Sequence, residues 1–305
     1  MQEIDLQDIL SSTGDLTIEK KVWYVAIIGR PNTGKSTFIN SLLWEKVSIT
    51  SNIPQTTRKR VLAIHNDSDS QIIFFDTPWI HKSNKEFNES INKVAIKSLE
   101  ESDLILYFID SSKPGWIEEN YIKDLISEVK TPILKVYTKS DLKPKITIPE
   151  GEEILKISST TKEGFENLLK NIKENIPTWP LLFPTDIYTK QDMFFRISEI
   201  IREKVFMHTK EELPHSIYVW VEEINEEKTL KWKDLLKLVA YIYTDTDSQK
   251  YIVVWKGWSL ITEIWKQARI ELEQIFDKKV FLALRVKVRK NWRKNEIFTK
   301  NLLGL

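Results

Sequence analysis

Apolar residues fall into two patterns along most of the chain: short continuous runs and longer stretches with helical spacing. The run KVWYVAIIG has strand length, and KSTFINSLLW after it places apolar residues three and four apart. RVLAIHN, QIIFFD, DLILYFID, TPILKVYT and EEILKIS repeat the strand pattern, with helix patterns such as KEFNESINKVAIKSLEE and EGFENLLKNIKENI between or after them. Strands alternating with helices predict a domain with a parallel α/β sheet over residues 21–177.

A second pattern follows a proline-rich segment. IPTWPLLFPTDIYT cannot be helical throughout and predicts a linker over residues 178–190. Over residues 191–305 we expect a helix around 191–207, strands in HSIYVWVEEIN and LLKLVAYIYTDT, a loop, a helix in SLITEIWKQARIELEQIF and a strand in KKVFLALRVKVRK. This order predicts a small α+β domain. Residues 1–20 have weak periodicity and form an N-terminal extension, either one short amphipathic helix or a mobile arm.

Composition excludes several classes of protein. The 305 residues suit two domains, and 45 Lys plus Arg against 44 Asp plus Glu give a net charge of +1, so contact with nucleic acid requires local clustering of charge. The chain has no cysteine, which excludes disulfide frameworks and thiolate chemistry and fits a reducing compartment. Apolar runs are too short for a spanning helix, and MQEIDLQDILSS is too acidic for a signal peptide. We therefore expect a soluble, cytoplasmic protein.

The most specific motif is GRPNTGKST at residues 29–37, which fits G-x-x-x-x-G-K-[ST] between a strand and a helix. Gly29 and Gly34 let consecutive backbone N–H groups turn toward phosphates, Lys35 reaches the β- and γ-phosphates, and Ser36 holds Mg²⁺. A glycine turn beside a surface lysine is the plainer alternative, and the strand and helix around the motif argue against it. The other predicted nucleotide-binding residues of this loop are Asn32, Thr33 and Thr37.

Two further strand ends carry candidate nucleotide contacts. Asp76 ends QIIFFD and is the natural second anchor for Mg²⁺, although an Asp at a strand end is a weak signal by itself. TKSD, residues 138–141, follows a later strand and places Asp141 to accept from guanine N1 and N2 while Lys139 packs over the nucleotide. Lys-x-Asp is common in solvated loops, so its position in this order of motifs provides the specificity.

These motifs resemble the Era family of ribosome-assembly GTPases over about residues 21–305. The resemblance implies an α/β P-loop GTPase domain followed by an α+β type II KH domain. It places Thr57, in the switch segment QTTR of residues 55–58, on Mg²⁺ together with Ser36 and Asp76. The implied nucleotide contacts outside the phosphate loop are Asp76, Trp79, Thr138, Lys139, Asp141, Ser158 and Ser159. Thr138 stands where the family usually has Asn and Ser159 where it has Ala, which weakens the case for guanine selectivity.

The resemblance also implies a slow GTPase with GTP or GDP, Mg²⁺ and K⁺ as cofactors. No glutamine lies just beyond Asp76 to orient an attacking water, because Ile80 occupies that neighbourhood. In such families an Asn in the phosphate loop, here Asn32, helps to bind a potassium ion. The predicted catalytic residues are therefore Lys35, Thr57 and Asn32.

The second domain resembles a KH domain through EELPHSIYVWVEE, DSQKYIVVWKGW, KQARIELEQIFDKKVFLALRVKV and NWRKNE. KH domains clamp single-stranded RNA with a Gly-x-x-Gly loop. Residues 278–300 carry nine Lys or Arg against one acidic residue, which supplies the positive field that phosphates require, although a solvated charged face is the plainer alternative. The predicted RNA-binding residues are Trp255, Lys256, Gly257, Trp258, Arg285, Lys287 and Arg289.

The implied function is a GTP-hydrolysing switch that binds 16S ribosomal RNA near its 3′ end and assists assembly of the 30S subunit. The expected protein is a monomer, with peripheral association at the inner face of the cell membrane left open. One rival is a non-switching RNA-binding protein with a vestigial nucleotide site. Another is a GTPase of the tRNA-modification or double-GTPase families, against which the single phosphate loop and the KH pattern argue.

Glycine is scarce, with 8 residues where about 21 are expected, while tryptophan reaches 11. Against the family pattern, seven tryptophans stand at glycine positions: Trp23, Trp44, Trp79, Trp179, Trp255, Trp258 and Trp265. If they are genuine, an indole at position 79 obstructs the switch and two more crowd the RNA clamp. If the gene uses UGA for glycine, all seven are glycine in the native protein. Ordinary core or base-stacking roles account for positions 255 and 258 alone.

Overall fold

The computed structural model describes residues 19–303 apart from short gaps at 51–52, 54–56, 81–85, 116–117, 152–153, 175, 210–212, 229–233 and 256–258. Most of the N-terminal extension, Gln55 of the switch segment and the RNA-loop residues Lys256, Gly257 and Trp258 therefore lie outside the described residues. The described residues form two compact units: the first ends at Lys190, and the second begins at Gln191 and also includes the described residues between Ile49 and Thr56. No helix in the described part is long and apolar enough to cross a membrane.

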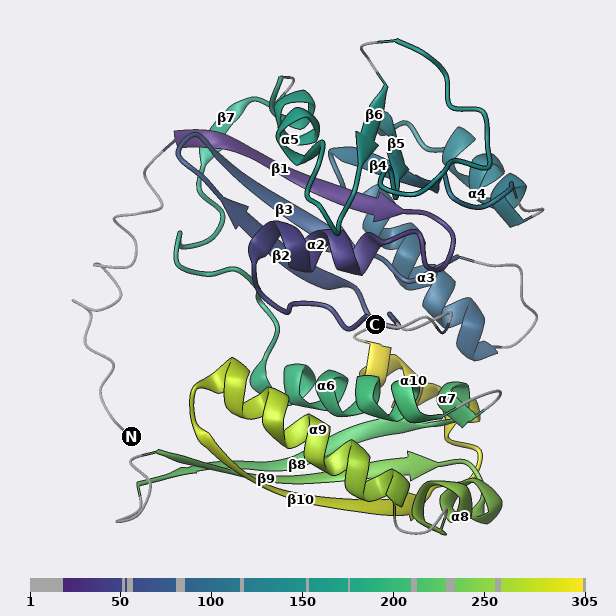
Figure 1. Cartoon of the computed structure of the whole chain (residues 1–305), viewed down its shortest axis with the longest axis vertical. Coiled ribbons are helices and arrows are strands. Elements are labelled where there is room, and N and C mark those ends of the chain that lie inside the picture. Colours follow the sequence, from purple (N-terminus) through teal and green to yellow (C-terminus); the bar gives the residue numbers. More distant parts are fainter. Residues whose placement is uncertain are drawn as a thin grey trace. The chain divides into compact units, whose positions relative to one another are not determined.

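The first unit is built on one twisted sheet with the strand order β2-β3-β1-β4-β5-β6 (Figure 1). The strands are β1 (Glu19–Ile28), β2 (Val61–Asn66), β3 (Ser70–Asp76), β4 (Leu104–Asp110), β5 (Ile133–Thr138) and β6 (Leu155–Ile157). The predicted parallel α/β sheet is confirmed for β3, β1, β4, β5 and β6, while β2 at one edge runs antiparallel to β3. Only residues 67–69 join these two strands, and a parallel pair needs a crossover of a dozen residues or more.

Both faces of this sheet are covered by helices, as its continuous apolar strands require. The helices are α2 (Lys35–Leu43), α3 (Glu86–Glu100), α4 (Glu118–Ser127) and α5 (Phe165–Lys173). On one face the ring of Phe38 in α2 packs edge-on against the rings of Phe74, Phe108 and Phe165. On the other face, buried residues of α3 and α4 share a core with alternate residues of β1, β3 and β4. The alternation of strand side chains thus supplies two cores from one sheet.

The segment 178–190, expected as a linker, is bound along the first unit. Its residues Thr178–Pro180 form β7, which pairs antiparallel with the start of β1. The side-chain amide of Gln71 then makes three hydrogen bonds to the backbone of this segment. Its Oε1 accepts from the N–H groups of Leu182 and Phe183, and its Nε2 donates to the Phe183 carbonyl. A proline-rich segment that cannot be helical is held here by strand pairing and by one buried amide.

The second unit is a three-stranded sheet with helices packed on one face (Figure 1). Its elements are α6 (Met193–His208), α7 (Leu213–Ser216), β8 (Tyr218–Glu227), β9 (Leu235–Thr244), α8 (Asp247–Trp255), α9 (Ser259–Phe276), β10 (Lys279–Val288), the 3-10 turn η2 (Trp292–Lys294) and α10 (Glu296–Leu303). In the order β10-β9-β8, β9 pairs antiparallel with β8 and parallel with β10. Residues of α6 and α9 pack against alternate strand residues in one core.

Helix α8 corrects the sequence prediction, which expected a loop between β9 and the following helix. The overlooked signal for the start of this helix is TDSQ, residues 246–249. The N–H of Gln249 donates to Thr246 Oγ1 at 3.2 Å, and Gln249 Oε1 accepts in return from the N–H of Thr246 at 3.2 Å. This reciprocal pair is a capping box, which satisfies two donors at the start of a helix.

The tryptophans differ in how well they fit their positions. Trp44 caps the end of α2 with φ 57° and ψ 18°, and its side chain is 82% exposed. Left-handed backbone costs an L-residue about 1–2 kcal/mol, and glycine is the usual residue at such a helix end. Trp265, in contrast, donates from Nε1 to the Leu282 carbonyl at 2.8 Å. Trp292, which stands where tryptophan is usual, is buried and donates to the Ser216 carbonyl. The backbone at position 44 thus favours the glycine interpretation, whereas the contact at 265 suits a genuine indole.

We expect Trp44→Gly to be more stable than Trp44→Ala by about 1 kcal/mol in urea unfolding. Both variants remove the same exposed ring, but only glycine relieves the left-handed strain, so their difference isolates the backbone term. Equal stabilities would contradict this assignment of strain. The glycine interpretation also predicts a glycine mass at position 44 when peptides of the protein from its native cell are analysed by mass spectrometry.

Candidate functional site

The residues predicted to bind a nucleotide lie at the carboxyl ends of neighbouring strands. The phosphate loop follows β1, Asp76 ends β3, Asp110 ends β4, and Thr138 ends β5. These strands run parallel, so their carboxyl ends meet at one edge of the sheet. In open α/β sheets this edge is where ligands bind. The fold therefore gathers side chains that are far apart in the sequence into one site.

The phosphate loop is shaped by close packing and by left-handed backbone. A Cβ on Gly29 would lie 2.5 Å from the carbonyl oxygen of Phe108, so no side chain fits there. Asn32 and Gly34 have φ values of 61° and 95°, which asparagine and glycine tolerate better than other residues. Thr33 closes the loop by donating from Oγ1 to the Arg30 carbonyl at 3.0 Å.

Lys35 is buried inside this loop. Its Nζ donates to the carbonyl oxygens of Gly29 at 2.9 Å and Arg30 at 3.1 Å. Burial lowers the pKa of Lys35 to about 8, although the carboxylate of Asp76 acts in the opposite direction. The ammonium group is thus held within the loop whose backbone N–H groups are available to phosphates.

Three oxygen-bearing side chains converge next to Lys35. Ser36 Oγ donates to Asp76 Oδ2 at 2.7 Å and lies 3.5 Å from Thr57 Oγ1. Burial raises the pKa of Asp76, while the hydrogen bond from Ser36 and the charge of Lys35 act against that rise. A carboxylate and two hydroxyls are the hard oxygen donors that Mg²⁺ prefers. These residues fit a magnesium ion shared with a nucleotide phosphate.

The predicted base-reading residues form two groups. Asp141 is exposed, as a residue that reads a bound base must be before binding. Thr138 is buried, and its Oγ1 donates to the Thr33 carbonyl at 2.8 Å, which ties the end of β5 to the phosphate loop. Ser158 is also buried and accepts from the backbone of its own loop, while the Ser159 carbonyl accepts from Ser41 Oγ at 2.9 Å. Thr138 and Ser158 are therefore buried, and their hydrogen bonds hold the loops of the site in place.

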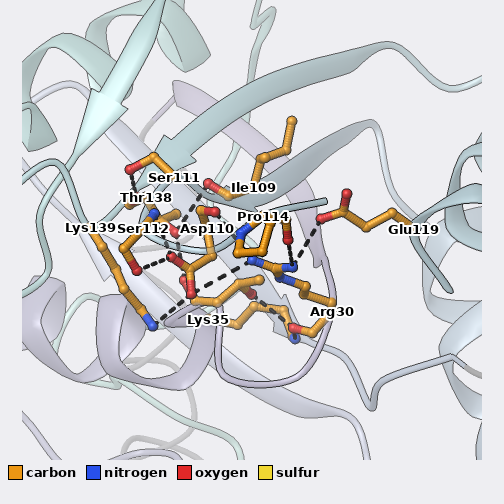
Figure 2. A network of polar contacts seen from close by, with 11 residues as sticks. Arg30, Lys35, Ile109, Asp110, Ser111, Ser112, Pro114, Glu119, Thr138 and Lys139 are labelled. Atoms are coloured by element: carbon orange, nitrogen blue, oxygen red, sulfur yellow. Dashed lines mark hydrogen bonds and ion pairs between the residues drawn. The ribbon is translucent and has the colours of Figure 1, made fainter. Parts of the chain in front are cut away.

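Figure 2 shows a network that sequence reasoning missed, centred on the buried carboxylate of Asp110. Lys139 Nζ donates to Asp110 Oδ2 at 2.8 Å, and Ser112 donates to Oδ1 at 2.6 Å. Burial acts to raise the pKa of Asp110, but these hydrogen bonds outweigh it and lower the pKa. Arg30 approaches from the phosphate loop, donating to the Asp110 carbonyl at 3.2 Å. The sequence signal for this network was that Asp110 ends an apolar strand, as Asp76 also does.

Trp79 and Ile80 directly follow Asp76, Thr77 and Pro78 in the chain and lie in the protein interior. Thr77, before them, donates from Oγ1 to the Ile27 carbonyl at 2.7 Å and so fixes the motif to β1. Ile80 is 1% exposed, and the partly buried ring of Trp79 packs against the same core. Ile80 therefore has no polar group that could take the part of a water-orienting glutamine.

The structure separates the predicted RNA-binding residues. Leu284 and Val286 of β10 pack against the core beneath α6 and α9, so the alternate residues Arg285 and Lys287 point to the opposite face. Strand alternation thus places Arg285 and Lys287 on the sheet face away from α6 and α9, and their part in RNA binding stays a prediction. Arg289 lies beyond β10 and donates from Nη1 to Tyr218 Oη at 3.2 Å.

Comparison with known proteins finds the same order of domains. Residues 24–139 match the family described as 50S ribosome-binding GTPase, and residues 212–293 match the KH domain family. GTPase Era of Treponema denticola is 40% identical over 291 residues, covering 91% of this chain and 98% of that protein. GTPase Era of Borrelia garinii is 43% identical over 295 residues, covering 93% and 100%.

Two solved structures are also similar over most of the chain. Aquifex aeolicus Era, as a variant bound to GDP·AlF4⁻, has a TM-score of 0.84 and 37% identity and covers 93% of this chain and 99% of its own. Era in complex with MgGDPNP and nucleotides 1506–1542 of 16S ribosomal RNA has a TM-score of 0.84 and 36% identity, with the same coverage.

The buried Lys35 makes stability depend on pH. Because its folded pKa of about 8 lies below the unfolded value, the unfolded chain binds more protons between these values, and stability rises with pH there. We expect the nucleotide-free protein to gain about 1.4 kcal/mol per pH unit between pH 8 and 10 relative to Lys35→Met, measured by urea unfolding. The exposed Lys123→Met serves as the control and should leave the slope unchanged. Parallel curves for wild type and Lys35→Met would contradict the low pKa.

Proposed function

The chain belongs to the GTPase Era family, and on this premise we propose that it binds GTP with Mg²⁺ and hydrolyses it to GDP and phosphate. We further propose that its second unit binds small-subunit ribosomal RNA, so that the nucleotide state governs its part in assembly of the 30S subunit. The observation that carries the proposal is the convergence of Ser36, Thr57 and Asp76 beside the buried amine of Lys35.

Each residue of this cluster has a separate task. The phosphate loop holds the β- and γ-phosphates with its backbone N–H groups, and Lys35 neutralises charge that develops on them during hydrolysis. Mg²⁺, when bound by Ser36, Thr57 and Asp76, supplies positive charge to the same phosphates. Asp141, which is exposed just beyond β5, recognises guanine, and Thr138 holds the end of β5 against the phosphate loop.

The RNA part of the proposal rests on the second unit. Its order of two antiparallel strands, two helices and a third strand parallel to the second extends over the KH match. A similar structure contains MgGDPNP and nucleotides 1506–1542 of 16S ribosomal RNA together. We propose the corresponding 3′-terminal segment as the RNA bound by this chain. A monomeric state and peripheral contact with the cell membrane are further proposals, supported by the family resemblance.

The Asp76→Asn variant tests the GTPase assignment. It removes the only carboxylate of the magnesium set, so we expect phosphate release from GTP at saturating Mg²⁺ to fall by about two orders of magnitude. The exposed Glu100→Gln should hydrolyse GTP at the wild-type rate. Hydrolysis unaffected in Asp76→Asn would contradict the assignment. Wild-type protein that binds GTP without hydrolysing it would instead support the non-switching RNA-binding alternative.

We propose a slow, potassium-assisted reaction as the finer form of this activity. Ile80 is apolar and buried in the core, so its side chain cannot orient water. Asn32 lies in the phosphate loop with φ 61°, and an amide oxygen is a suitable ligand for a cation. A potassium ion at that place would supply charge that an arginine finger gives other GTPases.

We expect GTP hydrolysis to be about tenfold or more faster in KCl than in NaCl at equal ionic strength. Asn32→Gly should abolish the difference between the two salts, because glycine accepts the left-handed backbone while removing the amide. Single-turnover rates in the two salts measure this effect. Equal rates in the wild type, or a preserved salt difference in Asn32→Gly, would exclude this role of Asn32.

A further inference from the structure

The outer face of the KH sheet, opposite α6 and α9, carries exposed aromatic rings. On this face Trp220 of β8 is 50% exposed and Phe281 of β10 is 60% exposed. Their strand neighbours Val219, Val221, Val280 and Leu282 lie in the buried core on the other side. A hydrophobic core therefore accounts for the inward residues but not for these two rings, whose faces are open to a ligand.

Positive charge on β10 lies level with Trp220 and just beyond it, on the side away from Phe281. Strand register places Arg285 beside Tyr241, and Tyr241 beside Trp220. Arg285 and Lys287 are exposed and take part in no ion pair within the described residues, and Lys287 Nζ lies 3.7 Å above the centre of the Tyr241 ring. Lys237, on the same face, is in contrast neutralised by Glu227 at 2.6 Å. The free cations thus follow β10.

Charge differs between the two edges of the sheet, because the acidic residues lie on β8. Glu223 faces Val239 at the β8 edge, and Glu226 and Glu227 follow near the end of that strand. Glu226 and Glu227 are paired with Lys278 and Lys237, so the positive charge available to phosphates on this face is that of Arg285 and Lys287 on β10. Trp220 and Phe281 are two strands and four residues apart in register, a separation of about 16 Å from ordinary strand spacings.

We propose that this outer sheet face, formed by Trp220, Tyr241, Phe281, Arg285 and Lys287, is a second RNA-binding surface that stacks unpaired bases on its two exposed rings. Two separated rings with cations beside one of them suit the bases and phosphates of a single strand better than a continuous apolar protein interface. The inference rests on the proposed RNA-binding function and extends it to the side of the sheet away from the predicted clamp. An RNA long enough to pass the sheet edge then contacts both faces.

The test compares two lengths of RNA with the full chain. We expect Trp220→Ala and Phe281→Ala each to weaken binding of the 16S segment of nucleotides 1506–1542 by about tenfold, measured by fluorescence anisotropy, the scale of one base stack. Binding of an RNA of about six nucleotides from its 3′ end should not change, because so short a strand occupies the clamp alone. Phe194→Ala, which removes an exposed ring from α6, is the matched control and should bind both RNAs normally.

Charge provides an independent measurement. Arg285→Gln should reduce the slope of log affinity against log salt by about 0.7 for the longer RNA, the value for one phosphate contact on a single strand. Wild-type affinity of Trp220→Ala and Phe281→Ala for the longer RNA would overturn the second surface. It would also be overturned by self-association that both variants abolish while RNA affinity stays intact. Failure of the wild type to bind either RNA would instead refute the proposed function itself.

Discussion

The close approach of Gly29 to the carbonyl of Phe108 sets the geometry on which the nucleotide site depends. A Cβ there would lie 2.5 Å from that oxygen, so the loop can pack directly against β4 only without a side chain. The same loop then passes the Asp110 carbonyl, which Arg30 contacts, and the Thr138 hydroxyl, which bonds to Thr33. One absent side chain therefore lets the ends of two strands, β4 and β5, be fastened to a single loop.

Polar groups buried at this edge act as parts of one structure. Lys35 and Asp76 lie near each other in a region that disfavours both charges, so the loop keeps an amine of lowered pKa beside a carboxyl of raised pKa. Anionic phosphates and a divalent cation would reverse both effects by pairing each group with an opposite charge. The site is thus electrostatically incomplete by itself, which makes ligand binding and local order favour each other.

The elements that were predicted best from the sequence are those that depend on residues close together in the chain. The phosphate loop, the strand ends at Asp76 and Thr138, and the α+β order of the second unit follow from periodicity and motif spacing. The antiparallel β2 followed from a connection too short for a crossover, and α8 from a capping box that was overlooked. The Asp110 network and the face of Arg285 depend on contacts between distant strands, which spacing along one strand does not specify.

The attachment of residues 178–189 to the first unit shortens the tether to the second. The last strand contact of this segment joins Thr189 to Ala63, and Asp192 already caps α6 by accepting from the Phe195 N–H. Only two residues lie between, a reach of about 10 Å when extended. Because so few residues lie between the two attachments, the connection can lengthen only if the segment 178–189 leaves its strand contacts with the first unit.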